Sequence, residues 1–149
     1  MKLVPIIELD LLIAFINRTD KLHDIATNIF KMIIDGALEN VAVPVSAYLE
    51  YELILKSRGY SEDFIRTDLE AFKNLENLGI IPLTLNIIIR ASRLRREYGL
   101  SYFDSLHAAS ALYHDGKIIS RDEAYDRVVG LERIDPKTII EDSLVFAQR

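Results

Sequence analysis

Short apolar runs alternate along the chain with longer segments in which apolar residues return every three or four positions. The runs lack polar alternation and are bounded by Gly, Asn or Pro, which is typical of strands buried on both faces of a parallel sheet. The strands predicted in this way comprise residues 3–7, 41–43, 80–83 and 117–119, with a weaker run at 131–134.

Helical patterns occupy the segments between the predicted strands. Thr84 and Ser101 are residue types that begin helices, and Gly99 is the type that ends one. In the helix predicted at residues 102–114, we expect Tyr113 to face inward with the other apolar side chains. The predicted helices comprise residues 22–38, 46–57, 61–78, 85–98 and 102–114. Strands that alternate with helices predict an α/β fold whose sheet is covered on both sides.

The composition indicates one domain over residues 1–149, because the chain has no repeat, no low-complexity segment and no linker. It lacks Cys, which excludes disulfide scaffolds, zinc ribbons and cysteine nucleophiles. Its net charge of −5 argues against a broad electrostatic attraction to nucleic acid but leaves room for a local basic strip. Glu8 and Asp10 interrupt the most apolar segment, so no membrane span is predicted and we expect a cytoplasmic protein.

Acidic residues gather where ligands bind in open α/β sheets, beyond the carboxyl ends of the strands. Glu8 and Asp10 close the first strand, Glu50 lies in the helix after the second, and Asp104 and Asp122 flank the fourth. Each acid alone can be a helix cap or a solvated side chain. Together they repel one another until a cation binds, and Mg²⁺ or Mn²⁺ prefers such oxygen ligands. Because waters on such ions can attack phosphorus, the pattern predicts a metal site for phosphodiester hydrolysis.

Four segments stand in an order that matches a known family. They are residues 8–14 (ELDLLIA), 45–50 (VSAYLE), 100–112 (LSYFDSLHAASAL) and 118–126 (IISRDEAYD), followed by a closing strand at 130–136. The chain resembles the PIN domain, the nuclease fold of VapC-type toxins in toxin–antitoxin pairs and of some RNA-processing enzymes. The resemblance spans residues 3–136. It implies a three-layer α/β/α sandwich around a parallel sheet of about five strands, with the first strand central.

The same resemblance implies a metal-dependent endoribonuclease that cleaves single-stranded or looped RNA. Ser120 would position Asp122 or a water. Glu50 is preferred to Glu52 because of its place in the motif, and Asp126 is interpreted as a surface acid. The implied ligands of one or two Mg²⁺ or Mn²⁺ ions are carboxylates: Glu8 or Asp10, Glu50, Asp104 and Asp122.

One departure from the family pattern leaves alternatives open. Glu8 stands where the family has Asp, and Leu9 replaces the usual hydroxyl residue. Either Glu8 binds metal through a longer arm, or Asp10 takes that role, or activity is reduced and the protein is a PIN-like binding module. A haloacid dehalogenase-like phosphatase is a further alternative, suggested by the spacing of Asp122 and Asp126, but that family needs Asp at the position of Glu8.

The resemblance also implies protein partners, namely an antitoxin and a second copy of the chain in a homodimer. The apolar helical segments 26–38 and 48–55 are candidates for these contacts, or they belong entirely to the core. His107 lies three residues after Asp104, and we interpret it as a satisfied, partly buried histidine without a catalytic role. A basic strip on one predicted helix is either a solvated face or a surface for the RNA backbone, and it comprises Arg90, Arg93, Arg95 and Arg96.

Overall fold

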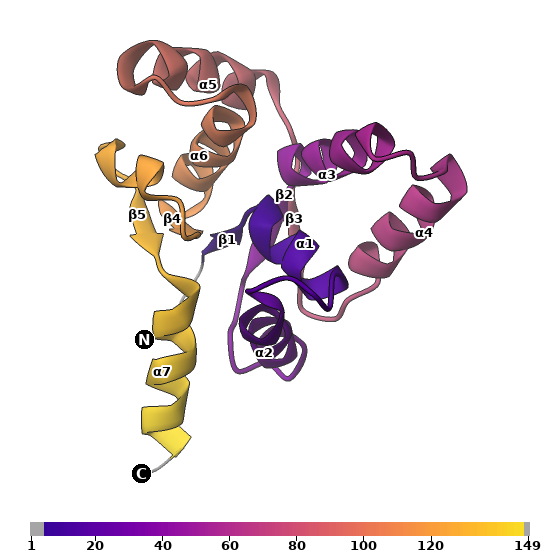
Figure 1. Ribbon diagram of the computed structural model, residues 1–149. Coiled ribbons are helices and arrows are strands. Elements are labelled where there is room, and N and C mark those ends of the chain that lie inside the picture. The colour runs from indigo at the N-terminus through magenta and orange to yellow at the C-terminus, as the bar shows by residue number, and fades with distance from the viewer. Residues whose placement is uncertain (1–4, 148–149) are drawn as a thin grey trace.

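Five parallel strands form one sheet in the order β3-β2-β1-β4-β5. The protein is described by a computed structural model that covers residues 5–147 (Figure 1). The strands are β1 (Ile6–Ile7), β2 (Ala42–Pro44), β3 (Gly79–Ile81), β4 (Lys117–Ile119) and β5 (Glu132–Ile134). The α/β class and the central place of the first strand are thus confirmed. Residues 3 and 4 of the first predicted strand lie outside the described range.

The central strand explains why its sequence is apolar without alternation. Ile6 pairs with Ala42 on one side and with Ile118 on the other, and Ile6 and Ile7 are both fully buried. A strand with neighbours on both edges and helices on both faces has no position for a polar side chain. Ile80 of the edge strand β3, in contrast, is half exposed.

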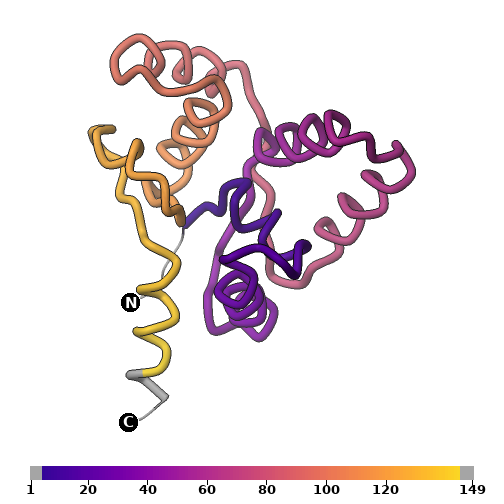
Figure 2. Tube along the Cα trace, viewed as in Figure 1, coloured from indigo at the N-terminus to yellow at the C-terminus, as the bar shows by residue number. Residues whose placement is uncertain are grey.

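Helices cover both faces of the sheet and give the molecule its three layers. One core joins the sheet to α1 to α4 and to α7, and the other joins it to α5 and α6. Figure 2 follows the chain through this arrangement. The helices are α1 (Leu9–Ile16), α2 (His23–Ile34), α3 (Val45–Ser57), α4 (Glu62–Lys73), α5 (Leu85–Tyr98), α6 (Tyr102–His114) and α7 (Pro136–Ala147). Among residues 5–147, no helix combines the length and apolar character that a membrane span requires.

The helix starts agree with the sequence better than the ends do. The hydroxyl oxygens of Thr84 and Ser101 accept hydrogen bonds from the backbone N–H three residues later, as capping residues should. The helices α2 and α4, however, are shorter than predicted. Gly36 adopts a φ of 81°, which α-helices do not allow, and the Asn77 side chain donates to the carbonyl oxygen of Ile34 at the end of α2.

Tyr113 corrects the prediction for the inward face of α6. Its side chain is 51% exposed, and the guanidinium of Arg90 lies 5.4 Å from the centre of its ring. The aromatic face thus interacts with a cation of α5 instead of the core. Two elements were also missing from the predicted helices, namely α1, which begins directly after β1, and α7.

Candidate active site

Glu8 and Asp10 point into different environments because the chain changes conformation between them. The strand β1 ends at Ile7, Glu8 has an extended backbone, and α1 begins at Leu9. The Glu8 side chain is 4% exposed, whereas Asp10, in the first turn of α1, is exposed. The two acids therefore do not share a strand face.

Two buried hydroxyl groups bind the carboxylate of Glu8. Ser120 Oγ donates to Oε1 at 2.9 Å, and the Tyr125 hydroxyl donates to Oε2 at 2.6 Å. Ser120 follows β4, and Tyr125 lies in a short 3-10 helix, η1 (Glu123–Arg127). The Tyr125 hydroxyl also lies 3.2 Å from Oδ1 of Asp104, so this phenol bridges two of the candidate ligands.

The protonation of this cluster is shifted by burial and by mutual repulsion. Burial, followed by the nearby charge of Asp10, raises the pKa of Glu8 to about 9, although the Tyr125 and Ser120 hydroxyls favour its charged form. At neutral pH the metal-free protein therefore keeps a proton on Glu8. Burial and the charges of Glu8 and Asp104 raise the pKa of Tyr125, which consequently remains a hydrogen-bond donor.

Asp10 is the acid that links Glu8 to the rest of the cluster. Its pKa is raised, first because its carboxyl group loses part of its hydration among the surrounding side chains. Repulsion from Asp104, Asp122 and Glu50 raises it further, while a hydrogen bond with Glu8 acts in the opposite direction. Because the charges of Asp104, Asp122 and Glu50 act on Asp10 and Glu8 is hydrogen-bonded to it, the five acids named from the sequence lie near one another.

Glu50 is bound by a histidine from a different helix. His107 Nε2 lies 2.9 Å from Glu50 Oε1, and His107 Nδ1 lies 2.8 Å from the hydroxyl oxygen of Ser46. His107 is 1% exposed and Ser46 is fully buried, whereas the Glu50 side chain is 21% exposed. The histidine is thus buried and satisfied, but its partner is Glu50 and not the sequence neighbour Asp104. The sequence held no local signal for this contact, because 57 positions separate Glu50 from His107.

Asp122 and Ser120 both bind backbone N–H groups around the start of η1. Asp122 caps η1, because its Oδ1 accepts from the backbone N–H of Ala124 at 2.9 Å. Ser120 Oγ accepts from the backbone N–H of Asp122 at 2.9 Å while it donates to Glu8. Ser120 therefore ties the Asp122 backbone to the Glu8 carboxylate.

Two further acids in or next to these motifs, Asp126 and Glu52, lie in ion pairs. Asp126 is bound through both oxygens by Arg133, at 2.8 and 3.1 Å, and hydrogen bonds from this guanidinium lower its pKa. Glu52 lies 3.7 Å from Lys56 on the next turn of α3. Both contacts are exposed and account for these acids without a metal.

The gathered acids are chemically suited to bind a divalent ion. Among residues 5–147, no three Asp, Glu or His side chains are oriented to hold one ion together. The reason lies in the contacts above, because hydroxyl and imidazole groups already bind the oxygens of Glu8 and Glu50. The donor set itself consists of hard oxygens that repel one another, which is the set that Mg²⁺ or Mn²⁺ prefers.

Comparison with known proteins identifies the family to which this domain belongs. The PIN domain family model matches residues 10–131. The chain belongs to the PIN domain family. Members of this family are generally nucleases that use divalent metal ions. The matched range begins at Asp10, so Glu8 precedes it. No curated protein matches the sequence.

Solved structures share the fold of this PIN domain at low sequence identity. VapBC2 from Rickettsia felis, bound to a DNA fragment from its promoter, is 17% identical with a TM-score of 0.66, and the match covers 89% of this chain and 100% of that one. A toxin–antitoxin complex from Klebsiella pneumoniae is 18% identical with a TM-score of 0.62, and the match covers 89% and 97%. Both likenesses concern the fold.

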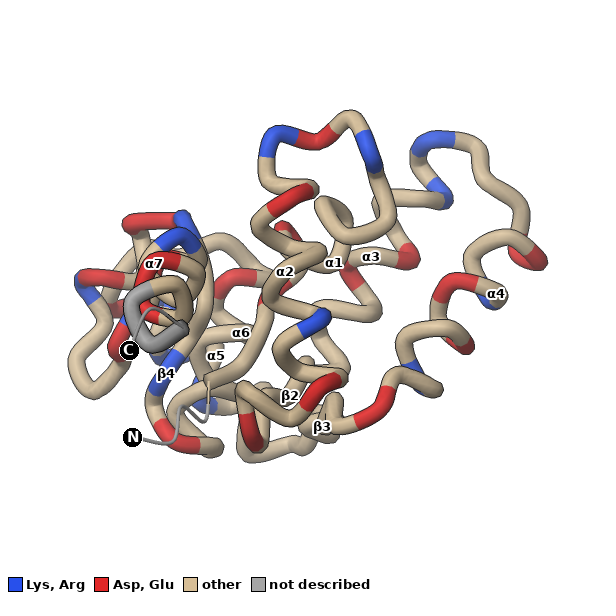
Figure 3. Tube along the Cα trace, turned by 90° about the horizontal axis from the view of Figure 1, so that it is seen from below, with Lys and Arg blue, Asp and Glu red and all other residues tan. Residues whose placement is uncertain are grey.

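The arginines of the basic strip differ in their surroundings: some make contacts within the PIN domain and others face solvent. Arg95 donates to Ser105 Oγ at 2.8 Å, and its guanidinium lies 5.1 Å from the ring centre of Tyr102. Arg93 and Arg96 are exposed, and Tyr102 is 59% exposed two residues before Asp104. Charges of both signs are interspersed along the chain as a whole, as Figure 3 shows.

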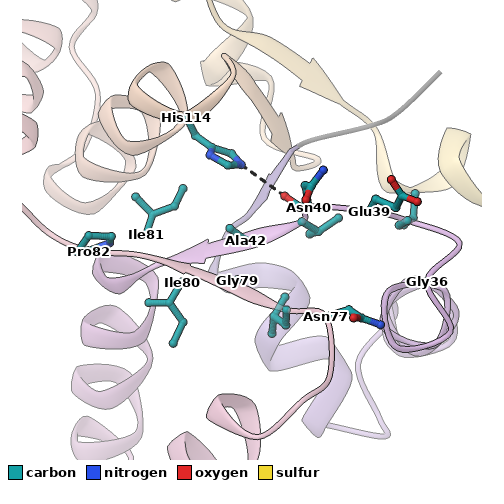
Figure 4. Close-up of a pocket in the computed structure, with 13 residues that line it drawn as sticks. Gly36, Glu39, Asn40, Ala42, Asn77, Gly79, Ile80, Ile81, Pro82 and His114 are labelled. Carbon is teal, nitrogen blue, oxygen red and sulfur yellow. Dashed lines mark hydrogen bonds between the residues drawn. The ribbon is translucent and has the colours of Figure 1, made fainter.

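A hollow of about 850 Å³ lies elsewhere, beside the edge strand β3 (Figure 4). Ala42 and Gly79, which line it, pair across β2 and β3, and a Cβ atom at Gly79 would lie 3.2 Å from that of Ala42. His114 Nε2 lies 3.4 Å from the carbonyl oxygen of Asn40 at its margin. The acids at the carboxyl ends of the strands do not line this hollow.

Proposed function

We propose that this PIN domain is an endoribonuclease that hydrolyses RNA phosphodiester bonds with Mg²⁺ or Mn²⁺ bound by carboxylates. The observation that carries the proposal is electrostatic. The charges of Glu50, Asp104 and Asp122, which come from three separate segments, all act on Asp10. Proteins rarely gather several acids in this way, because their repulsion is unfavourable until a cation compensates it.

The proposed ligands are Asp10, Glu50, Asp104 and Asp122, with Glu8 as the ligand that departs from the family pattern. A bound divalent ion would supply positive charge at the phosphate and an activated water. Ser120 would position Asp122 through its backbone N–H and Glu8 through its carboxylate, as these contacts support.

We assign the RNA strand to the surface next to the start of α6. Arg93 and Arg96 offer exposed positive charge for phosphates, and Tyr102 offers an exposed ring on which a base can stack. The guanidinium of Arg95 lies over that ring and is itself hydrogen-bonded to Ser105. This arrangement favours a single strand over a duplex, whose bases are not free to stack on protein.

An antitoxin is the proposed protein partner, because the structural neighbours are toxin–antitoxin complexes. The apolar stripe of α2 belongs to the core, since Ile29 and Ile33 are fully buried. The helices α3 and α4 and the turn between them instead expose large apolar or aromatic side chains at 40 to 51%, namely Leu49, Leu53, Tyr60 and Phe64. We place the antitoxin contact there. Co-purification of a co-expressed antitoxin should be lost with Leu53→Asp and retained with Leu144→Asp, another exposed leucine.

A homodimer is proposed through a second apolar surface, formed by β3 and the first half of α5. Its side chains are 43 to 70% exposed: Ile80, Leu85, Ile88 and Ile89. Exposed apolar surface of this extent beside an unpaired strand edge favours a protein contact. Light scattering should show a dimer for the wild type and a monomer for Ile89→Lys.

A catalytically weakened binding module is the second candidate. It is favoured by Glu8, both of whose oxygens accept hydrogen bonds from the protein. The phosphatase alternative has no comparable support, because Asp126 is bound by Arg133 and Asp is missing at the position of Glu8.

The test of the main proposal is cleavage of a labelled RNA panel with Mg²⁺ or Mn²⁺. Cleavage by the wild type that stops with chelator and with Asp104→Asn would support the nuclease. Asp126→Asn is the matched control, because it removes an acid that lies in an ion pair. Metal binding and RNA binding without cleavage would favour the binding module, and equal cleavage by the wild type and Asp104→Asn would reveal a contaminating nuclease.

A further inference from the structure

A chain of hydrogen bonds connects the interior of the protein to the candidate metal site. It begins at the buried hydroxyl of Ser46 on α3, passes through the imidazole of His107 on α6 and ends at Oε1 of Glu50 on α3. Two buried polar side chains cost free energy unless each is satisfied, and here each satisfies the other.

The geometry of this chain selects one form of the histidine. Within residues 5–147, the hydrogen-bond partner of the Ser46 hydroxyl is His107 Nδ1. If the hydroxyl proton is to be satisfied, Ser46 donates to Nδ1, and the ring proton must then reside on Nε2. Nε2–H in turn donates to the carboxylate of Glu50. Ser46 thus fixes both the tautomer and the orientation of the ring.

Other buried serines of the same region show what a purely structural hydroxyl does. Ser105 and Ser110, on α6, donate to backbone carbonyl oxygens of their own helix at 2.6 and 2.8 Å. Such a local bond satisfies a buried hydroxyl without any partner from another element. Ser46 makes no such bond among the described contacts and is directed across to α6.

We propose that His107, oriented by Ser46, is a positioning residue that holds Glu50 for a divalent cation. Glutamate has a flexible side chain, and the Nε2–H bond restrains it through Oε1. Oε2 accepts no hydrogen bond from residues 5–147 and is therefore available to the ion. The inference rests on the proposed function. It deepens that function by naming the groups that prepare one ligand.

The test measures Mn²⁺ affinity by isothermal titration calorimetry. Ser46→Ala and His107→Leu should each weaken binding by roughly tenfold or more, the effect expected when a group behind a metal ligand is lost. His107→Gln should bind more nearly like the wild type, because its side-chain amide can donate from the place of Nε2. Ser110→Ala is the matched control and should leave the affinity unchanged. In a Glu50→Gln background, Ser46→Ala should cause no further loss.

A second readout does not depend on metal. Nitrogen NMR of histidine-labelled protein should show His107 as the Nε2–H tautomer, and Glu50→Gln should shift the Nε2 resonance. Because Ser46→Ala removes a single hydroxyl, it keeps the test available if His107→Leu does not fold.

The outcomes separate the two proposals. If the wild type binds Mn²⁺ and Ser46→Ala and His107→Leu bind it equally well, the positioning role is wrong and the proposed function stands. An Nδ1–H tautomer would also overturn the positioning role. If the wild type binds neither Mn²⁺ nor Mg²⁺, the proposed function itself fails.

Discussion

The hydroxyl of Tyr125 lies 2.6 Å from Oε2 of Glu8, although 117 positions separate the two residues. Both side chains are buried. In the motif expected from the sequence, Glu8 takes the place of a shorter Asp, and its side chain ends between Tyr125 and Ser120. The longer side chain is thus met by two donors from elsewhere in the chain.

Glu8→Gln should make the stability of the metal-free protein less dependent on pH. The pKa of Glu8 is about 9 in the folded protein and 4.5 without its surroundings. Between these values the unfolded chain has lost this proton and the folded chain keeps it, so the free energy of unfolding falls as pH rises. The slope for one such group reaches about 1.4 kcal/mol per pH unit.

Urea unfolding with chelator, at about pH 6 and about pH 8, checks this prediction. The stability advantage of Glu8→Gln over the wild type should grow with pH. Glu52→Gln is the control, because that acid lies in a surface ion pair with Lys56. An advantage that does not change with pH would show that Glu8 ionises normally.

Tyr125→Phe should destabilise the metal-free protein by about 1–2 kcal/mol, as expected for the loss of a buried hydrogen bond to a carboxyl group. Because the hydroxyl favours the charged form of Glu8, its removal should also raise the pKa of Glu8 further. Tyr51→Phe is the matched control, since the Tyr51 hydroxyl donates to Asp68 at 2.6 Å on the helices α3 and α4. Both variants should lose stability in chemical denaturation, but only Tyr125→Phe should change Mn²⁺ affinity.

Metal affinity should rise with pH. A cation that binds Glu8 and Asp10 displaces protons from groups whose pKa values are raised. The apparent affinity for Mn²⁺ should therefore increase from about pH 6 to about pH 8, with proton release that calorimetry in buffers of different ionisation enthalpy can count. The thermal stabilisation by Mn²⁺ should grow in parallel and vanish with chelator. A pH-independent affinity would mean that the ion binds away from these two acids.

RNA binding should depend on salt through the exposed arginines of α5. Arg93→Ala and Arg96→Ala should each weaken binding of a short single strand and reduce the slope of log affinity against log salt by about 0.7. Arg66→Ala is the control, because that arginine lies on α4 in an ion pair with Asp63. Filter binding at several salt concentrations with a catalytically inactive variant measures these slopes. Equal slopes for all variants would exclude this face of α5 from the RNA surface.

The sequence predicted those parts of the fold that depend on local pattern. The apolar runs located the strands because both faces of each inner strand are buried, as at Ile6 and Ile118. Thr84 and Ser101 located helix starts because a capping hydroxyl acts within one turn. The end of α2 was missed because it involves a contact distant in sequence, the bond from the Asn77 side chain to the carbonyl oxygen of Ile34.

The candidate site likewise has residues that the sequence predicted and residues that it did not. The sequence named the acids, since each follows a predicted strand or opens a helix. It could not name Tyr125, which reads as an ordinary core aromatic until the fold brings its hydroxyl to Glu8. Nor could it pair His107 with Glu50, because 57 positions separate them and no local spacing records the contact. The hydroxyl and imidazole groups that bind these acids could therefore be recognised only from the three-dimensional structure.

The central place of β1 has a consequence for the time at which the candidate site is completed. Glu8 and Asp10 leave the ribosome well before Ser120, Asp122 and Tyr125, which come with β4 and η1 and pair with or pack beside β1. A nascent or truncated chain that ends before β4 and η1 has four of the five acids but neither of the hydroxyl donors to Glu8. The candidate site therefore stays incomplete during synthesis until β4 and η1 have folded onto β1.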